Sequence, residues 1–388
     1  MLTIIKNAEV YAPEKLGRKD VLLACGRIVA VEDEIGLPVS FPVQVIDAAG
    51  LILVPGLIDA HVHIAGAGGE GGPASRTPEL LLSDMLSAGV TTVIGCLGTD
   101  GITRSVESVL MKVKSLRAEG VSAWMFTGSY QVPTPSITGD FARDIALIEE
   151  VIGVGEVAIS DHRSSCPTTD ELVRIAAHAR VAGMIGGKAG IVNIHLGDAK
   201  DPFRPIYDAV EASELTFRQF FPTHINRNPY IFEDAKTYGL KGYIDITTSS
   251  YPYYADEEIK PSTALRLLLE AGVPIGHITF TSDACGSLPG FDPVTGELVK
   301  METGLPAANL RELRDAVMDE LIPLETALKV LTSNPAHILK LTKKGRIAAG
   351  MDADILLLDK ALRIVSMFAM GNQVMEDGVL LKKGAYEK

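Results

Sequence analysis

The residues best suited to chemistry form a short cluster, Asp59-Ala60-His61-Val62-His63, which closes an apolar run. Side chains alternate across a β-strand, so residues 59, 61 and 63 point to the same face. Two imidazoles that point to one place are suitable ligands for a divalent metal such as Zn²⁺. Because the pair alone also fits an ordinary polar strand end, a metal site requires further ligands elsewhere.

Other residues of types that bind metals also lie at the ends of apolar runs. His195 ends IVNIH, His224 lies in FFPTHINRN, and Asp283 ends ITFTSD. One such histidine is usually structural, but here four of the 8 histidines share the position. A metal-bound water has a pKa near ~7 rather than ~15.7, and Asp283 would take its proton and pass it to a leaving nitrogen. No Gly-x-Ser-x-Gly elbow or phosphate-binding glycine loop competes with this interpretation.

Eight apolar, β-branched runs are predicted as strands. They are Leu57–His63, Thr92–Cys96, Ala123–Ser129, Val157–Ser160, Ile191–His195, Phe220–Ile225, Tyr243–Thr247 and Ile278–Asp283. Helical patterns lie between and after them, for example at Thr77–Ala88, Ile102–Ala118, Thr169–Ala182, Glu257–Ala271, Leu305–Met318 and Pro323–Leu331. This alternation predicts a parallel sheet, and eight repeats favour closure into a barrel over an open doubly wound sheet.

The two ends of the chain are strand-rich and differ from the middle. Val21–Ala24 and Arg27–Val31 flank a Cys-Gly pair that fits a two-residue hairpin turn. We therefore predict an α/β fold, a (β/α)₈ TIM-type barrel with a small β-sandwich domain formed by both chain termini. Residues 1–54 and 345–388 would form the β domain, and residues 55–344 the barrel.

The composition excludes several partners. The 388 residues carry 49 acidic and 36 basic side chains, and this net charge of −13 disfavours nucleic acid and anionic membranes. Four separated cysteines, Cys25, Cys96, Cys166 and Cys285, form no CxxC pair, which argues against a disulfide framework and a cysteine-based zinc site. The start MLTIIKNAEV lacks the pattern of a signal peptide. A cytoplasmic protein without membrane spans is expected.

A His-x-His in the first strand, single histidines in the fifth and sixth, and an aspartate in the eighth resemble the amidohydrolase superfamily. The resemblance spans the whole chain and includes GMDADILLLD. The segments GGEGGPASRTPE, GTDGITR, ISDHRS, PTHINRN and TSDACGS are similar to the isoaspartyl (β-aspartyl) dipeptidases within it. The resemblance implies a metallo-dipeptidase that uses metal-bound hydroxide on dipeptides linked through an aspartate side chain. It also implies two divalent metal ions, with zinc the first candidate, and a homo-oligomer.

The resemblance also assigns roles to residues. It makes His61 and His63 ligands of one metal, His195 and His224 ligands of the other, and Asp283 a proton shuttle that also touches the first metal. The remaining assignments concern the substrate: Glu70 for its amino group, Tyr130 for its scissile carbonyl, Arg163 and Arg227 for its carboxylates, and Thr99 and Ser287 as further contacts. Without the family, these six fit a solvated loop acid, a packed aromatic residue, surface ion pairs and loop hydroxyls.

One position departs from the family pattern. The family usually bridges its metals with a carboxylated lysine on the fourth strand, where this chain has Glu156 in VGEVAIS. We expect Glu156 to bridge the two metals, while a structural carboxylate beside a single metal remains the alternative. Lys188 is a poor substitute, because an extended run would place it ~23 Å from His195.

Two alternative functions remain open at this point. One is a cyclic-amide hydrolase of the dihydroorotase or hydantoinase type, with the same metal ligands. The set Glu70, Arg163 and Arg227 instead favours a substrate with a free amine and two carboxylates. The other is a non-catalytic scaffold, which is disfavoured because only the bridging position differs from the family.

Overall fold

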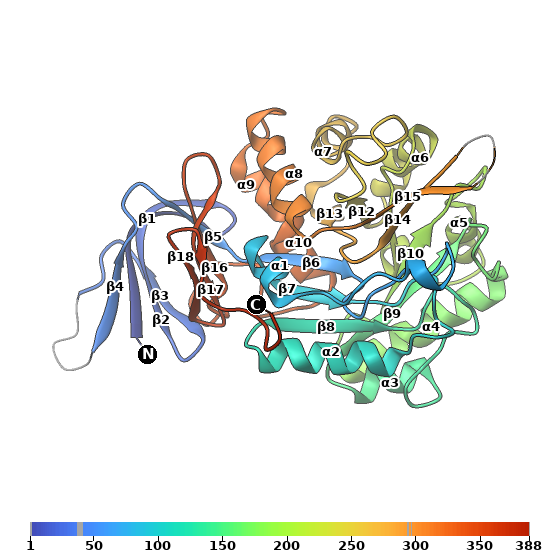
Figure 1. The fold of residues 1–388 in the computed structure, drawn as a ribbon, viewed down its shortest axis with the longest axis horizontal. Helices are drawn as coiled ribbons and strands as arrows, with labels where there is room; N and C mark the ends of the chain where they lie inside the picture. Colours follow the sequence, from blue (N-terminus) through green and yellow to red (C-terminus); the bar gives the residue numbers. More distant parts are fainter. Residues whose placement is uncertain (1, 37–41, 293–294, 296, 388) are drawn as a thin grey trace.

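The computed structural model describes residues 2–36, 42–292, 295 and 297–387. The fold is mixed α/β: a curled parallel sheet surrounded by helices lies beside a β-sheet made from both ends of the chain (Figure 1). The predicted α/β class is therefore confirmed, as is the meeting of the two termini in one sheet.

The parallel strands follow the chain order. They are β6 (Leu57–Val62), β7 (Val90–Gly95), β8 (Ser122–Thr127), β9 (Val151–Ile159), β10 (Ile191–Leu196), β11 (Phe220–Thr223), β12 (Ile244–Thr247) and β13 (Ile278–Thr281). Strands β6 to β11 form one sheet, and β12 pairs with β13. The sheet curls so that β12 packs beside β11 and β13 beside β6, where a parallel bridge joins Val62 to Ala284.

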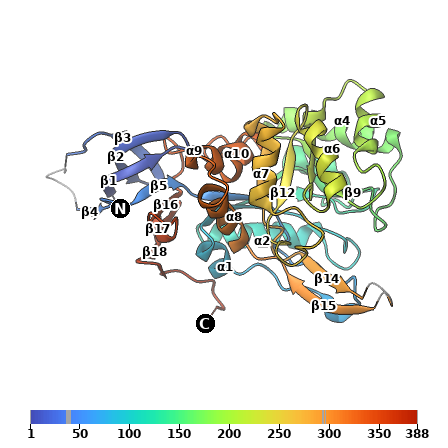
Figure 2. The same ribbon diagram turned by 90° about the horizontal axis from the view of Figure 1, so that it is seen from above.

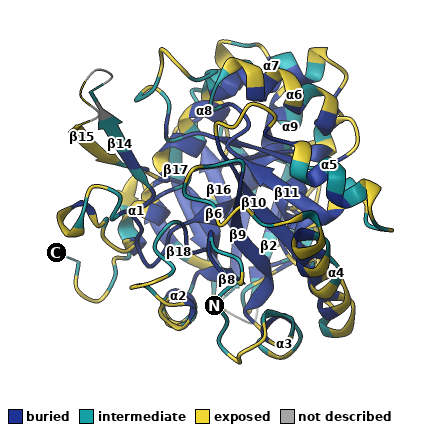
Figure 3. Ribbon diagram, turned by 90° about the vertical axis from the view of Figure 1, so that its right-hand side faces the viewer, coloured by how far each residue is buried: buried dark blue, intermediate teal, exposed yellow. Residues whose placement is uncertain are grey.

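The sequence of these strands suits burial on both faces. Every residue of β6, β7, β9 and β10 is buried, as expected for parallel strands covered by helices. Figure 3 shows these buried strands at the centre of the molecule, with exposed residues concentrated on the helices and loops around them. Polar side chains in these strands are therefore unusual, because both faces of the sheet are covered and bulk water does not reach them.

The helices connect successive strands and complete the outer layer. They are α1 (Leu82–Ser87), α2 (Val106–Ala118), α3 (Phe141–Leu147), α4 (Thr169–Gly186), α5 (Arg204–Glu211), α6 (Pro229–Gly239), α7 (Pro261–Glu270), α8 (Ala307–Met318), α9 (Leu324–Ala327) and α10 (Ser333–Ile338). A capping box of Thr168 and Glu171 starts α4 at the predicted residue. Helix α1 begins five residues later than predicted, because the Thr77 hydroxyl binds Ala67 N and Cys285 O and holds this segment as a loop.

The terminal sheet takes strands from both ends of the chain. They are β1 (Leu2–Tyr11), β2 (Lys15–Ala24), β3 (Arg27–Glu32), β4 (Val43–Asp47), β5 (Ile52–Pro55), β16 (Ile355–Leu358), β17 (Ile364–Ala369), β18 (Asn372–Glu376) and β19 (Val379–Leu380). Antiparallel pairing of β5 with β16 joins the two ends. The predicted hairpin is confirmed: β2 and β3 pair around Cys25 (φ 50°) and Gly26 (φ 75°), the left-handed pair of a type I′ turn.

One hairpin interrupts the alternation of strand and helix. Strands β14 (Ser287–Phe291) and β15 (Leu298–Thr303) pair between β13 and α8, and Figure 2 shows them projecting from the body of the molecule. Nothing in the apolar periodicity predicts this hairpin. Within the described residues, no helix is both long enough and apolar enough to cross a membrane.

Candidate metal centre

The four predicted histidine ligands converge on one buried carboxylate. Glu156 lies in the middle of β9 and is fully buried. Its Oε2 lies 3.4 Å from His61 Nε2 and 3.9 Å from His63 Nε2. Its Oε1 lies 2.7 Å from His195 Nδ1 and 3.1 Å from His224 Nε2. Each carboxylate oxygen therefore faces one pair of histidines, which is the arrangement expected of a bridging ligand.

Asp283 joins the first of these pairs. Its Oδ1 lies 3.0 Å from His63 Nε2 and 3.6 Å from His61 Nε2. Asp283 follows β13 with φ 53°, and His224 follows β11 with φ 65°. Left-handed backbone is uncommon for residues other than glycine, and such strained residues concentrate at functional sites. The conformation turns both side chains from a strand end toward the cluster.

The donor atoms fit a cation. Among the described residues, Glu156 Oε2 and Asp283 Oδ1 are buried and take part in no hydrogen bond. A buried carboxylate oxygen without a partner is costly, and a bound cation would satisfy both. Ligands of a tetrahedral zinc ion with bonds of ~2.0–2.2 Å lie about 3.3–3.6 Å apart. His61 Nε2 lies 3.4 Å from Glu156 Oε2 and 3.6 Å from Asp283 Oδ1, which fits this range.

Three further side chains hold the histidine rings in place. Asn193 Oδ1 lies 3.1 Å from His61 Nδ1. Thr247 Oγ1 lies 2.7 Å from His224 Nδ1, and Asp161 Oδ2 lies 2.9 Å from His195 Nε2. Each contact uses the nitrogen that faces away from Glu156, which orients the other nitrogen toward the cluster.

Sequence reasoning did not select these three residues, although two of them carried a signal. Asn193 lies two residues before His195 and so shares its face of β10. Asp161 lies two residues before Arg163, and its carboxylate accepts two hydrogen bonds from that guanidinium, from Nε at 3.0 Å and from Nη2 at 2.8 Å. The contact of Thr247 depends on the spatial neighbourhood of β11 and β12, which the sequence does not display.

Burial and neighbouring groups shift the pKa values of the site in different directions. Burial opposes the charged form of His61 and His63, but Cys96 and the neighbouring carboxylates raise the pKa of both rings well above the usual histidine value. Burial lowers the pKa of His224 to about 4, so its ring is neutral and retains a lone pair. Burial opposes ionisation of Glu156, but His61 and His195 outweigh it and hold the pKa of Glu156 well below its usual range. Burial also raises the pKa of Tyr130 well above its usual value, so the phenol keeps its proton.

Four of the residues predicted to contact substrate lie beside the cluster. Tyr130 Oη lies 2.7 Å from His195 Nδ1, and the Arg163 guanidinium lies 5.3 Å from the centre of the Tyr130 ring. Arg163 Nη1 lies 3.6 Å from Glu70 Oε1 and 3.4 Å from Thr99 Oγ1. Glu70 Oε2 is buried and has no hydrogen-bond partner among the described residues. This oxygen is therefore free to accept a hydrogen bond from a positively charged group of a ligand.

The other two predicted substrate residues are Arg227 and Ser287. Arg227 Nε pairs with Asp198 Oδ1 at 3.1 Å, and Ser287 is the first residue of β14. Neither side chain forms a hydrogen bond or ion pair with the ligand cluster within the described part of the chain, although the backbone N–H of Arg227 donates to His224 O at 3.1 Å. Lys188 is remote: its Nζ donates to Ile145 O at 2.7 Å and to Ile148 O, which agrees with its dismissal as a bridge.

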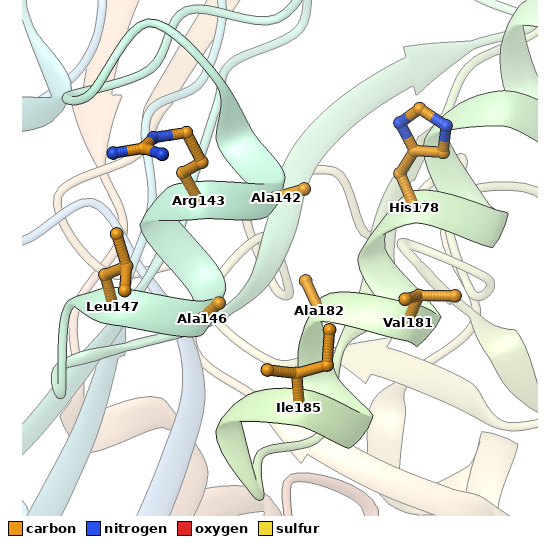
Figure 4. A pocket seen from close by; sticks show the side chains of 8 residues that line it. All are labelled: Ala142, Arg143, Ala146, Leu147, His178, Val181, Ala182 and Ile185. Carbon is orange, nitrogen blue, oxygen red and sulfur yellow. The ribbon is translucent and has the colours of Figure 1, made fainter.

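A separate apolar hollow of about 350 Å³ lies on the outer layer, between α3 and α4. Figure 4 shows its lining: Ala142, Arg143, Ala146, Leu147, His178, Val181, Ala182 and Ile185. It holds one histidine and no carboxylate, so it offers neither a metal site nor an acid–base pair. The strand-end cluster remains the candidate site.

Comparison with known proteins decides the family. The crystal structure of the β-aspartyl dipeptidase of Fervidobacterium islandicum AW-1, in complex with the β-Asp-Leu dipeptide, is 45% identical to this chain, with a TM-score of 0.93 over 98% of each chain. The chain belongs to the β-aspartyl dipeptidases. A second structure of the Fervidobacterium enzyme is 43% identical, with a TM-score of 0.89 over 98% of this chain and 99% of that one.

More distant relatives place this family within a broader one. The model of the amidohydrolase family matches residues 239–369. The dihydroorotase of Desulforapulum autotrophicum is 24% identical over 92% of this chain and 89% of its own length. The predicted resemblance, to the superfamily and to the dipeptidases within it, is confirmed.

Proposed function

We propose that this protein hydrolyses the isopeptide bond of β-aspartyl dipeptides. The observation that carries the proposal is the convergence of four histidines on the two oxygens of buried Glu156, with Asp283 beside His63 and His61. The Fervidobacterium relative with bound β-Asp-Leu supports this substrate class. The cyclic-amide alternative shares the ligand set, so the substrate residues must discriminate between the two.

The pair of Glu70 and Arg163 favours a β-aspartyl group. In such a dipeptide the free ammonium and the free carboxylate are attached to the same carbon atom. A carboxylate and a guanidinium only 3.6 Å apart match two opposite charges at that spacing. A cyclic imide offers no ammonium for Glu70. We assign the second carboxylate, on the leaving residue, to Arg227, with Thr99 and Ser287 as further contacts.

The donor set suits two divalent ions, with zinc the first candidate because imidazole and carboxylate are common zinc ligands. His61, His63, Glu156 and Asp283 would hold one ion, and Glu156, His195 and His224 the other. When bound, such ions act as Lewis acids that make hydroxide available near neutral pH.

The chain supplies the remaining groups. Asp283 has an oxygen without a hydrogen-bond partner, so it can accept a proton from the attacking water and deliver it to the leaving amine. The protonated Tyr130 hydroxyl can donate a hydrogen bond to the carbonyl oxygen as negative charge develops on it. The Asp161 carboxylate holds Arg163 and His195 together and so fixes the substrate carboxylate relative to the ligand cluster.

A substrate comparison tests the proposal. The purified protein, loaded with zinc, is assayed with β-Asp-Leu, α-Asp-Leu and dihydroorotate. We expect leucine release from β-Asp-Leu alone, because α-Asp-Leu places its ammonium and carboxylate on different carbon atoms. His195→Ala should abolish the release, while His178→Ala, on the outer face of α4, should leave it unchanged.

Two results would contradict the proposal. Turnover of dihydroorotate without release of leucine from β-Asp-Leu would favour the cyclic-amide hydrolase. No turnover of any substrate by protein that retains its metal would favour the non-catalytic scaffold.

We further propose that the eight parallel strands form a closed (β/α)₈ barrel within residues 55–344. The support is the contact of β13 with β6 and the bridge between Val62 and Ala284. Residues 1–54 and 345–388 would form the companion β-sandwich domain, supported by their shared sheet. Limited proteolysis should cut within loops and leave the two units associated.

We also propose that copies of the chain associate, as the family resemblance implies. Leu147, Val181, Met184 and Ile185 expose more than half of their surface on α3 and α4. Neighbouring exposed apolar side chains are commonly covered in assemblies. Sedimentation velocity should show an oligomer at micromolar concentration, and a monomer would contradict the proposal.

A further inference from the structure

Cys96 lies inside the candidate metal centre, although the proposed function gives it no role. It directly follows β7 and is fully buried. Its backbone N–H donates to Val62 O at 3.1 Å, which places it beside the His-x-His segment. Its Sγ lies 3.6 Å from His61 Nε2 and 3.8 Å from His63 Nδ1.

The sulfur position matches that of a ligand. Donor atoms of His61, His63, Cys96 and Glu156 all lie within 4.8 Å of one another. A zinc ion with a Zn–S bond of ~2.3 Å and Zn–N bonds of ~2.0–2.1 Å separates tetrahedral sulfur and nitrogen ligands by about 3.5–3.6 Å. The observed distance from Cys96 Sγ to His61 Nε2 is 3.6 Å. The sulfur has only a long contact with Val62 O, at 3.7 Å, as a competing hydrogen bond.

We propose that Cys96, as a thiolate, is a ligand of the metal ion held by His61, His63 and Glu156. The inference rests on the proposed metal-dependent function and deepens it. When the ion binds, the S–H bond breaks, the sulfur lone pair bonds to the metal, and the proton passes to solvent. The ion then has two nitrogens, one sulfur and the Glu156 oxygen as donors, with Asp283 beside them.

This ligand makes the two metal positions unequal. With Cys96, the first position has four protein donors besides Asp283, whereas the position of Glu156, His195 and His224 has three. Four protein ligands are typical of ions that are held permanently, and three leave a place for water or substrate. Because four other donors hold this ion, Asp283 can contact it and still exchange a proton without releasing it. A thiolate also favours zinc or cadmium over magnesium or manganese at the first position.

Spectroscopy of the cobalt-substituted holoenzyme tests the sulfur bond. A thiolate bound to Co²⁺ gives a charge-transfer band in the near ultraviolet that imidazole and carboxylate do not give. We expect this band in the wild type and in Cys285→Ser, which removes a buried thiol outside the donor set. We expect Cys96→Ser to lose the band and to lose its first-position metal to a chelator at least tenfold faster.

Zinc X-ray absorption of the wild type gives an independent measurement, which is needed if Cys96→Ser does not fold. We expect scattering from sulfur at ~2.3 Å, with one sulfur for two zinc ions. A spectrum with only nitrogen and oxygen neighbours would overturn the inference. So would a cobalt band that persists in Cys96→Ser.

These outcomes separate the inference from the proposed function. If β-Asp-Leu is hydrolysed by protein with two metal ions but without a metal–sulfur bond, the dipeptidase proposal stands and the role of Cys96 is wrong. If metal–sulfur scattering is present but β-Asp-Leu is not hydrolysed, the ligand stands and the substrate proposal is wrong.

Discussion

The two oxygens of Glu156 look into different surroundings. Around Oε2 lie His61 and His63, with the Cys96 thiol and Asp283 beside them. Around Oε1 lie His195 and His224, and the Tyr130 hydroxyl and Arg163 border this side. The first half of the site, around Oε2, is rich in donor atoms from strand ends. The second half, around Oε1, adjoins the residues that we assign to substrate binding. The Glu156 carboxylate thus links two metal positions. The first is suited to retaining its ion, and the second is suited to presenting its ion to substrate.

The largest effect should come from removing the shared residue. Glu156→Ala deletes a ligand from both halves, so we expect metal content to fall well below two ions per chain and hydrolysis of β-Asp-Leu to disappear. Elemental analysis and the leucine assay measure the two effects. Glu149→Ala, which removes an exposed carboxylate near the start of β9, serves as control. One metal per chain with full activity in Glu156→Ala would remove the bridge.

Asp283→Asn should separate metal retention from proton transfer. The amide keeps the shape of the side chain but cannot carry the proton, so kcat should fall by about 10²–10⁴-fold. Because Cys96 completes the donor set of the first half, metal content should stay near two ions per chain. Loss of the first-half metal in this variant would show that Asp283 is an essential ligand.

Arg163→Met should act mainly on substrate binding. It retains much of the side-chain volume but removes hydrogen bonds to a carboxylate, which are worth about 1.5–3 kcal/mol. We therefore expect KM to rise by about 10- to 100-fold with metal content unchanged. A similar fall in kcat at constant KM would instead place Arg163 in transition-state stabilisation.

Thr247→Val should have a smaller effect, confined to the second half. It removes the 2.7 Å contact to His224 Nδ1 and preserves the shape of the side chain. Metal affinity of the second half should weaken by about tenfold, the lower end for residues that orient a ligand. The cobalt–thiolate band of the first half should be unchanged. Equal loss from both halves would contradict their independence.

Bicarbonate should have no effect on the activity of the enzyme. A bridge made by Glu156 needs no carbon dioxide, whereas a carboxylated lysine does. Metal-free protein should therefore recover full activity with zinc at the same rate in bicarbonate-free buffer and in added bicarbonate. Faster recovery with bicarbonate would point to a modified lysine.

Much of the site follows from the sequence alone. Strand alternation puts His61 and His63 on one face, and parallel strands bring their carboxyl ends to one edge, so His195, His224 and Asp283 could be grouped without coordinates. The regular pattern of apolar runs also indicates the parallel sheet. These features depend on local periodicity, which is written directly in the order of residues.

Only the tertiary structure decided which atoms meet. In the sequence, Cys96 was only the last residue of an apolar strand, and the absence of a CxxC pair argued against a cysteine ligand. Ligands drawn from separate strands need no short spacing, so β7 can bring its thiol to the histidines of β6. Asp161, Asn193 and Thr247 likewise gain their roles from neighbours across the sheet. Arg227 and Ser287 lie on segments beyond the strand ends, where periodicity carries no positional information, so the pairing of Arg227 with Asp198 could not be foreseen.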